Sequence, residues 1–333
     1  MSLRSAGLIV CFAAFAAFRA FAQGQQYQAP LASDGHADLQ GFWVNNNATP
    51  LERPPELADH PTLTDAEVKA MRKKAEEMFF GKLDAAFGDQ MFRTVWANVK
   101  GLKMGFTSTD GETGDYSSEW NDHRVWDNRT SLITDPADGH VPPLTARAKK
   151  LQEDQMKALQ RPAESPEDRS FSERCITRGS PAVRAGYQSY YQIVQTPTAV
   201  MIMTEMFHDV RVIKLDDRPH PPAVVREWLG DSRGHWEGNT LLVDTTNYRS
   251  RAFQSVSSEK LHITERFTRQ DAETIRYEIT VNDPDTWTKP WSLMIPLQRS
   301  AQPVYEYACH EGNIGLAGIL AGARADEAKA SSK

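Results

Sequence analysis

The sequence predicts a mainly β protein, in which an antiparallel meander forms a barrel or a highly curved sheet, with a helical insertion after the first strand. From residue 187 onward, segments rich in β-branched and aromatic residues recur about every ten residues. Turn residues such as Thr196-Pro197 and Glu237-Gly238-Asn239 separate them, and no long helical periodicity lies between them. Such a run of short strands is typical of antiparallel barrels and sandwiches.

We expect one domain over residues 23–333, built from a first strand at 38–45, a helical insertion at 62–160 and a strand-rich core at 187–310. In the insertion, Thr64 and Glu67 form a capping-box pattern at the start of an amphipathic helix. A second helix is predicted from Thr145 to Leu159, and "VYEYAC" at 304–309 is predicted to be the last strand. If the first strand pairs into the later sheet, the two halves of the chain cannot separate.

The N-terminus has the pattern of a secretory signal peptide. Arg4 precedes an apolar run over residues 6–18, and Ala20 and Ala22 are small residues at the positions that a signal peptidase reads. Cleavage is predicted after Ala22, which places the mature protein in the periplasm or outside the cell. The apolar run is too short to cross a bilayer, which takes about 20 residues, so no membrane partner is expected after cleavage.

The composition limits the partner classes. Loss of Arg4 and Arg19 with the signal changes the formal net charge from −6 to −8. An acidic exported chain without basic clusters is not expected to bind nucleic acid or an anionic membrane. The sequence has no G-x-G-x-x-G, P-loop or C-x-x-C-H motif, so no cofactor is predicted. It also lacks the H-x-x-x-H, H-E-x-x-H and paired-cysteine patterns, so no metal site is predicted, and a small-molecule ligand or substrate is the expected partner.

Two cysteines, Cys175 and Cys309, remain in the predicted mature chain. In an oxidising compartment, such a pair most simply forms one disulfide. The rival interpretation is a free catalytic thiol at Cys309 beside His310. Because adjacent strand residues point to opposite faces, His310 is poorly placed to activate that thiol, and we predict the disulfide.

Two polar segments supply candidate catalytic groups. "EMFHDVRV" brings Glu205, His208, Asp209 and Arg211 together between two apolar strands. A histidine beside carboxylates can be held in one tautomer and poised for proton transfer, and a nearby arginine can bind an anionic group. The opposing interpretation is a charged hairpin turn in solvent.

The second segment is "VYEYACHEGN", in which an ideal strand would put Glu306 and His310 on the face opposite Cys309 and into a cavity. The predicted catalytic residues are therefore His208, His310, Asp209 and Glu205. The predicted substrate-binding residues are Arg211, Arg233, Tyr305 and Trp236. Further ionisable residues on the strands predict a polar interior network, namely Arg233, His235, Asp244, His262, Glu265, Arg266, Tyr277 and Glu278.

Two sets of motifs carry resemblances. "LQGFW" and "RGHWEGNTLLVD" each contain Gly-x-Trp and are similar to the element that opens the first strand of lipocalin-like barrels. "DSRGHWEGNTLLVDTTN", "DPDTWTKPW" and "YEYACHEGN" resemble an uncharacterised family of secreted bacterial proteins. The second resemblance implies export and a compact β-rich fold, and it brings no established activity.

Two functions compete at this level. One is an exported enzyme that acts on a small organic molecule by cofactor-free His/carboxylate acid–base chemistry, as a lyase, isomerase or hydrolase. The alternative is a lipocalin-like binding protein for a lipophilic or aromatic small molecule. Carriers of apolar ligands need mostly apolar walls, so the density of charged groups on the strands favours the enzyme. The decisive observation is whether His208, Arg233 and His310 meet in one cavity.

Overall fold

The computed structural model of the chain describes residues 27–79, 88–105, 124–177, 179–183, 185 and 189–332. The strands are β1 (Gly41–Val44), β2 (Ile133–Asp135), β3 (Tyr190–Gln195), β4 (Ala199–Thr204), β5 (Val210–Lys214), β6 (Asp231–Glu237), β7 (Thr240–Thr246), β8 (His262–Arg269), β9 (Thr274–Asn282) and β10 (Trp291–Arg299). The helices are α1 (Asp65–Phe79), α2 (Gly88–Val99), α3 (Ala146–Leu159) and α4 (Ile314–Ser331), with short 3₁₀ turns η1 (Pro55–Leu57), η3 (Pro166–Asp168) and η4 (Met206–His208).

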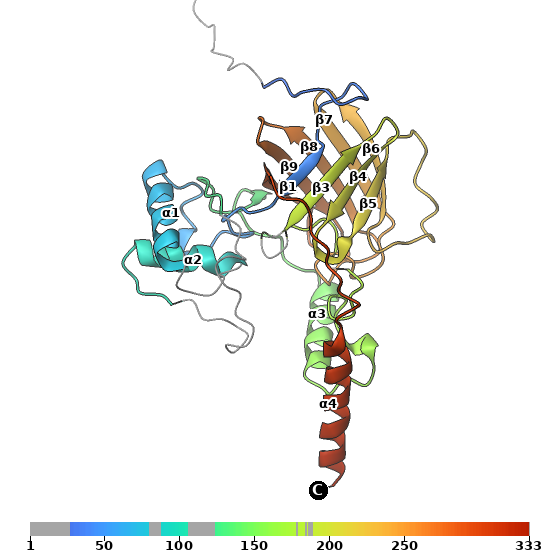
Figure 1. Cartoon of the computed structure of the whole chain (residues 1–333). Helices are drawn as coiled ribbons and strands as arrows, with labels where there is room; N and C mark the ends of the chain where they lie inside the picture. Colours follow the sequence, from blue (N-terminus) through green and yellow to red (C-terminus); the bar gives the residue numbers. More distant parts are fainter. Residues whose placement is uncertain are drawn as a thin grey trace, which may run out of the picture.

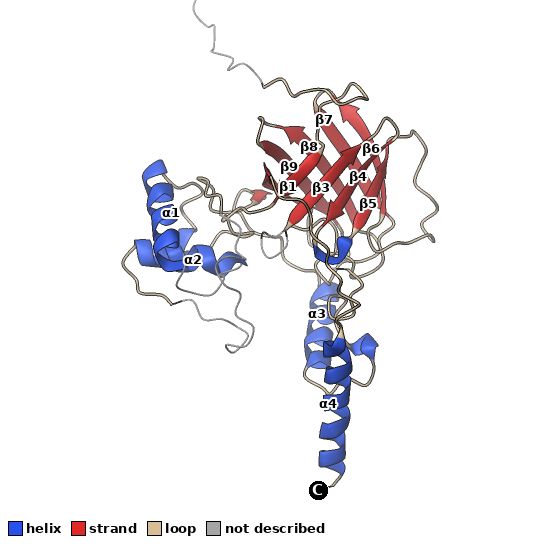
Figure 2. Ribbon diagram, viewed as in Figure 1, coloured by secondary structure: helices blue, strands red, loops and turns tan. Residues whose placement is uncertain are grey.

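The strands form one sheet that closes into a barrel (Figure 2). Its order is β1-β3-β4-β5-β6-β7-β8-β9-β10-β2, and β1 pairs with both β3 and β10, which joins the two edges. The prediction of a mainly β barrel is confirmed. The pairings are antiparallel with one exception, because β5 and β6 run parallel and are connected by a crossover through residues 215–230.

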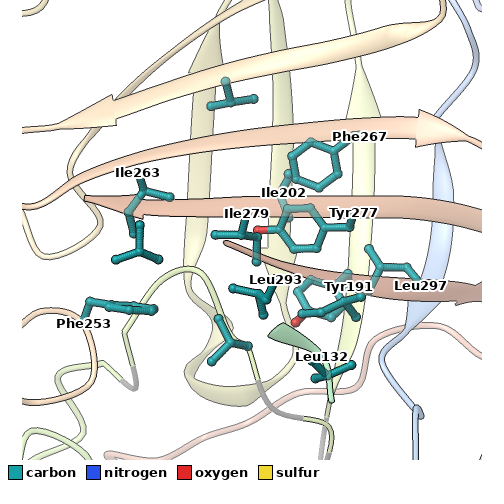
Figure 3. Close-up of a cluster of buried hydrophobic side chains, with 14 of the residues drawn as sticks. Leu132, Tyr191, Ile202, Phe253, Ile263, Phe267, Tyr277, Ile279, Leu293 and Leu297 are labelled. Atoms are coloured by element: carbon teal, nitrogen blue, oxygen red, sulfur yellow. The ribbon is translucent and has the colours of Figure 1, made fainter. Parts of the chain in front are cut away.

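The barrel core follows from alternation along the strands. In β8, Ile263 and Phe267 are buried, whereas the alternate residues His262 and Thr264 are partly exposed. This alternation is expected for a strand with one face toward the barrel interior. Figure 3 shows how such inward side chains meet; those it labels are Leu132, Tyr191, Ile202, Phe253, Ile263, Phe267, Tyr277, Ile279, Leu293 and Leu297.

The helices lie outside the barrel, with α1 and α2 to one side and α3 and α4 at one end (Figure 1). α1 begins with the predicted capping box, since Glu67 N–H donates to the Thr64 hydroxyl at 3.2 Å and Thr64 N–H donates to the Glu67 carboxylate at 3.0 Å. α3 follows the N-cap Thr145 and ends at Leu159, as predicted. α2 packs with α1 in a second apolar cluster that includes Met71 and Phe92. Neither α2, α4 nor β2 was predicted from the sequence.

Two sequence predictions have different outcomes at the chain ends. The predicted signal peptide over residues 1–22 lies outside the described residues. The prediction of a strand at 304–309 is wrong, because the last strand ends at Arg299 and the following residues form no strand. Polar residues alternate with apolar ones there, but the segment buries neither face in the barrel. Among the described residues, no helix has the length and apolar character needed to cross a membrane.

Candidate functional site

The barrel wall is weakly joined between β5 and β6. These strands pair at two positions, Ile213 with Ser232 and Lys214 with Arg233, whereas β5 pairs with β4 along its whole length. The close approach of β6 to β5 depends on Gly234, because a Cβ there would lie 2.7 Å from Ile213 Cγ2. Residues 210–212 of β5 have no pairing with β6. On this side, the crossover residues 226–230 face them instead of a strand.

A groove lies over this open part of the wall, with a volume of about 550 Å³. We call it the β5 groove; it is lined by Ile176, Asp209, Val210, Arg211, Val212, Lys214, Arg226, Glu227, Trp228, Leu229, Gly230, Asp231, Ser232 and Arg249. Val210 and Val212 point outward from β5 and are 43% and 50% exposed. The groove therefore has an apolar floor beside an indole ring, with charged side chains around it.

The barrel interior offers far less space. The cavity inside it measures about 20 Å³, which is room for about one water molecule. Its walls include Tyr191, Ile202, Phe267 and Tyr277. Asp209, Arg211 and Leu229 line both the cavity and the β5 groove, so they form the partition between them.

An ion pair crosses the interior beside this cavity. Arg211 from β5 binds Glu265 from β8 through two hydrogen bonds, one of them from Nη2 to Oε1 at 2.8 Å. The Tyr277 hydroxyl of β9 donates to the same carboxylate. Glu265 is 0% exposed. In all three strands every second residue is buried, and Arg211, Glu265 and Tyr277 each lie on the buried, inward face.

The electrostatics of this triad follow from its burial. Burial lowers the pKa of Arg211, but the charge of Glu265 and its hydrogen bonds outweigh burial, so the pKa is raised. Burial and then the Glu265 charge raise the pKa of Tyr277 well above its usual value, so its hydroxyl stays a donor. The predicted interior network is thus present at Glu265 and Tyr277. Arg211, predicted to bind substrate, is hydrogen-bonded to Glu265 and also lines the cavity and the β5 groove.

The remaining ionisable residues of the predicted network lie mostly on the outside. His220 of the crossover contacts Asp231 through Nδ1 at 2.7 Å and Asp244 through Nε2 at 2.9 Å. Arg233, predicted to bind substrate, bonds Asp231 through Nε at 2.8 Å and Asp216 of the crossover at 2.8 Å. These contacts hold the crossover against the outer face of β6 and β7.

His208 and Glu205 anchor the C-terminal segment. His208 Nδ1 accepts a hydrogen bond from Tyr307 N–H at 2.9 Å, and the buried Glu205 carboxylate accepts one from Tyr305 N–H at 3.1 Å. Asp209 accepts a bond from the Thr177 hydroxyl at 2.7 Å. These side chains hold the C-terminal segment and the Thr177 loop in place. This structural role accounts for the cluster of polar residues at 205–209.

The other predicted site residues are scattered. His310 and Glu306 are exposed, which follows from the absence of the predicted strand. The Tyr305 side chain is exposed as well, and Trp236 stacks on His36 at 4.8 Å at the end of β6. His208, Arg233 and His310 line neither the cavity nor the β5 groove.

The predicted disulfide between Cys175 and Cys309 is confirmed. It fixes the segment after β10 to the loop that follows η3, next to the groove residue Ile176. Across the described ranges, no group of three or more His, Cys, Asp or Glu side chains is arranged to hold a metal ion.

Sequence reasoning missed the main lining residues of the groove, above all Trp228 and Leu229. They lie in "VVREWLG", where large apolar residues interrupt a polar crossover between strands. That interruption was the available signal, because a loop residue of this size is expected to pack against something.

Comparison with known proteins adds no assignment: no protein-family model, no curated protein and no solved structure matches the chain.

Proposed function

We propose that the protein is an exported binding protein for a small organic molecule with an aromatic or lipophilic body, and that this ligand lies in the β5 groove. The contrast in volume supports this most: about 550 Å³ in the groove against about 20 Å³ inside the barrel. Pockets for small molecules typically measure about 300–1,000 Å³. The closed β-barrel carries this site, and the proposed ligand lies on its outer wall rather than inside it.

The side chains of the groove suit such a ligand. Val210, Val212 and Leu229 offer apolar contact. The partly exposed Trp228 ring adds aromatic contact area beside them, and the Arg249 guanidinium carbon lies 5.3 Å from the centre of that ring. Val210 and Val212 are both exposed on the outward face of β5, so they are available for this contact. Lys214 and Arg249 at the groove are positioned to orient polar substituents.

Export rests on the predicted signal peptide. The Cys175–Cys309 disulfide and the lack of a membrane-spanning helix in the described chain are compatible with a periplasmic or secreted protein. The resemblance to an uncharacterised secreted bacterial family supports the same location.

A thermal-shift screen of aromatic and lipophilic compounds tests the binding function. Compounds that stabilise the wild type should lose most of that effect in Trp228→Ala, which removes the indole of the groove. Trp236→Ala is the matched control, since its ring stacks on His36 instead. Equal binding by both variants would contradict the assignment to the groove.

A second candidate function is cofactor-free acid–base catalysis on the same ligand, as a lyase, isomerase or hydrolase. The observation that favours it is Asp209, a carboxylate that lines both groove and cavity and is oriented by the Thr177 hydroxyl. Metabolite pools incubated with the protein and compared by mass spectrometry test it. Conversion by the wild type that is lost in Asp209→Asn would support catalysis, and binding without conversion would oppose it.

A further inference from the structure

Arg251 lies in the loop between β7 and β8, which spans residues 247–261. Arg251 is partly buried there, and its Nε–H is buried without a hydrogen-bond partner. The guanidinium carbon lies 5.0 Å from the centre of the Phe171 ring. Within the described chain, Arg251 forms no ion pair with a carboxylate.

The charged neighbour of Arg251 is another arginine. Burial lowers the pKa of Arg251, and the positive charge of Arg174 lowers it further. Arg174 lies 3.6 Å from Glu167, a carboxylate that is 70% exposed. Arg174 lies three residues after Phe171, in a turn where its N–H donates to the Ser170 carbonyl at 3.1 Å, and Arg251 contacts the Phe171 ring. Both arginines are therefore close to this ring, with the exposed Glu167 carboxylate beside Arg174.

This arrangement is costly unless something negative joins it. The buried Nε–H of Arg251 has lost its hydration and gains no hydrogen bond in return. A second positive charge nearby adds repulsion. An oxyanion between the two side chains removes both costs, because guanidinium groups bind carboxylate, phosphate and sulfonate oxygens through paired N–H donors.

We propose that Arg251 and Arg174 form a binding site for an oxyanion, and that Phe171 forms one wall of this site. The site goes beyond the proposed function, since it does not require the β5 groove to hold a ligand. Phe171 packs edge-to-face on Trp228 at 4.6 Å, and Trp228 lines the groove. The oxyanion therefore binds next to the groove, with this aromatic pair between the two sites.

Thermal unfolding with added inorganic phosphate, at constant ionic strength, tests the site. At a concentration about ten times its Kd, phosphate should raise the folded-to-unfolded ratio of the wild type about tenfold. Arg251→Met should lose this response, because the fork of donors is gone. Arg218→Met is the matched control, as Arg218 is an exposed arginine of the crossover whose contacts are to Asp216.

Phenyl phosphate, tested in parallel, separates two sources of the oxyanion. Stabilisation by inorganic phosphate identifies a site for free anions, and stabilisation by phenyl phosphate alone identifies the charged end of an organic ligand. If Arg251→Met does not fold, Arg251→Lys replaces it and should show a weakened response, since it keeps the charge but loses the fork. Equal responses of the wild type and the Arg251 variant to both compounds would overturn the proposal.

Discussion

Arg211 and Glu265 form a two-bond ion pair across the barrel interior, which ties β5 to β8. β5 is one of the two strands of the weakly paired seam with β6. β5 is the strand that forms the floor of the β5 groove. The pair therefore holds in place the part of the wall on which the proposed ligand site depends.

Arg211→Met should reduce the free energy of unfolding by about 3–5 kcal/mol, because it leaves the Glu265 carboxylate buried without a cation. Urea denaturation measures this loss. The double variant Arg211→Met/Glu265→Gln should recover most of it, since no uncompensated charge remains and the side-chain carbonyl of the introduced glutamine can still accept from the Tyr277 hydroxyl. If the double variant is as unstable as the single one, packing and not charge explains the role of Arg211.

The inward direction of Glu265 was predictable from the sequence, but its pairing with Arg211 was not. Alternation in β8 places Glu265 on the same face as Ile263 and Phe267, so its inward direction follows from the sequence. Its partner does not, because the crossover between β5 and β6 sets which strands face each other. That crossover is a long-range connection without a local signal, and it also creates the groove.

In the C-terminal segment, the sequence predicted a strand that the structure does not contain. Alternation at "VYEYACHE" predicted a strand with His310 facing a cavity, but a strand also needs a free sheet edge to pair with. β10 already has β1, β2 and β9 as neighbours. Cys309, bonded to Cys175, holds the segment to a loop, and His310 remains exposed.

Removal of the disulfide in Cys175→Ala/Cys309→Ala should cost about 2–5 kcal/mol of stability, because the bond closes a long loop in the unfolded chain. The sequence separation of the two cysteines is 134 residues. Urea denaturation with and without reductant measures the effect, and reductant should destabilise the wild type but not the variant. Reactive thiols at both Cys175 and Cys309 in the denatured, unreduced protein would refute the bond.

Stability should depend on pH through His262 and Asp244. A hydrogen bond between them raises the pKa of His262 and lowers that of Asp244. The His262 contribution is full below its unfolded pKa of about 6.5 and is lost as the pH rises through its raised folded value. The Asp244 contribution is present above its unfolded pKa of about 3.9 and is lost as the pH falls through its lowered folded value.

The pair is therefore strongest between about pH 4 and pH 6.5. His262→Gln should lower the free energy of unfolding more at about pH 5.5 than at about pH 9, as measured by urea denaturation at each pH. His60→Gln, at an exposed histidine outside the barrel, should show no such difference. An equal loss at both pH values would argue against the pair.

The two histidines first expected to transfer protons should behave differently from catalytic residues. His208→Ala removes the acceptor of Tyr307 N–H and should cost about 1 kcal/mol or more of stability. His310→Ala should cost little, since that side chain is exposed. Denaturation curves and mass spectrometry of metabolite pools check both. Turnover by the wild type that either variant loses without unfolding would restore the original catalytic hypothesis.

The most direct test of the groove fills it. Val212→Trp places a large ring on the groove floor, where Val212 is half-exposed, so the barrel core is unchanged. The probe is 1-anilinonaphthalene-8-sulfonate, whose fluorescence rises on binding an apolar site. Titration should show binding by the wild type and by Val224→Trp, a control at an 86% exposed valine that does not line the groove, and a large loss in Val212→Trp. Unchanged probe affinity in Val212→Trp would contradict the proposal that the groove is the ligand site.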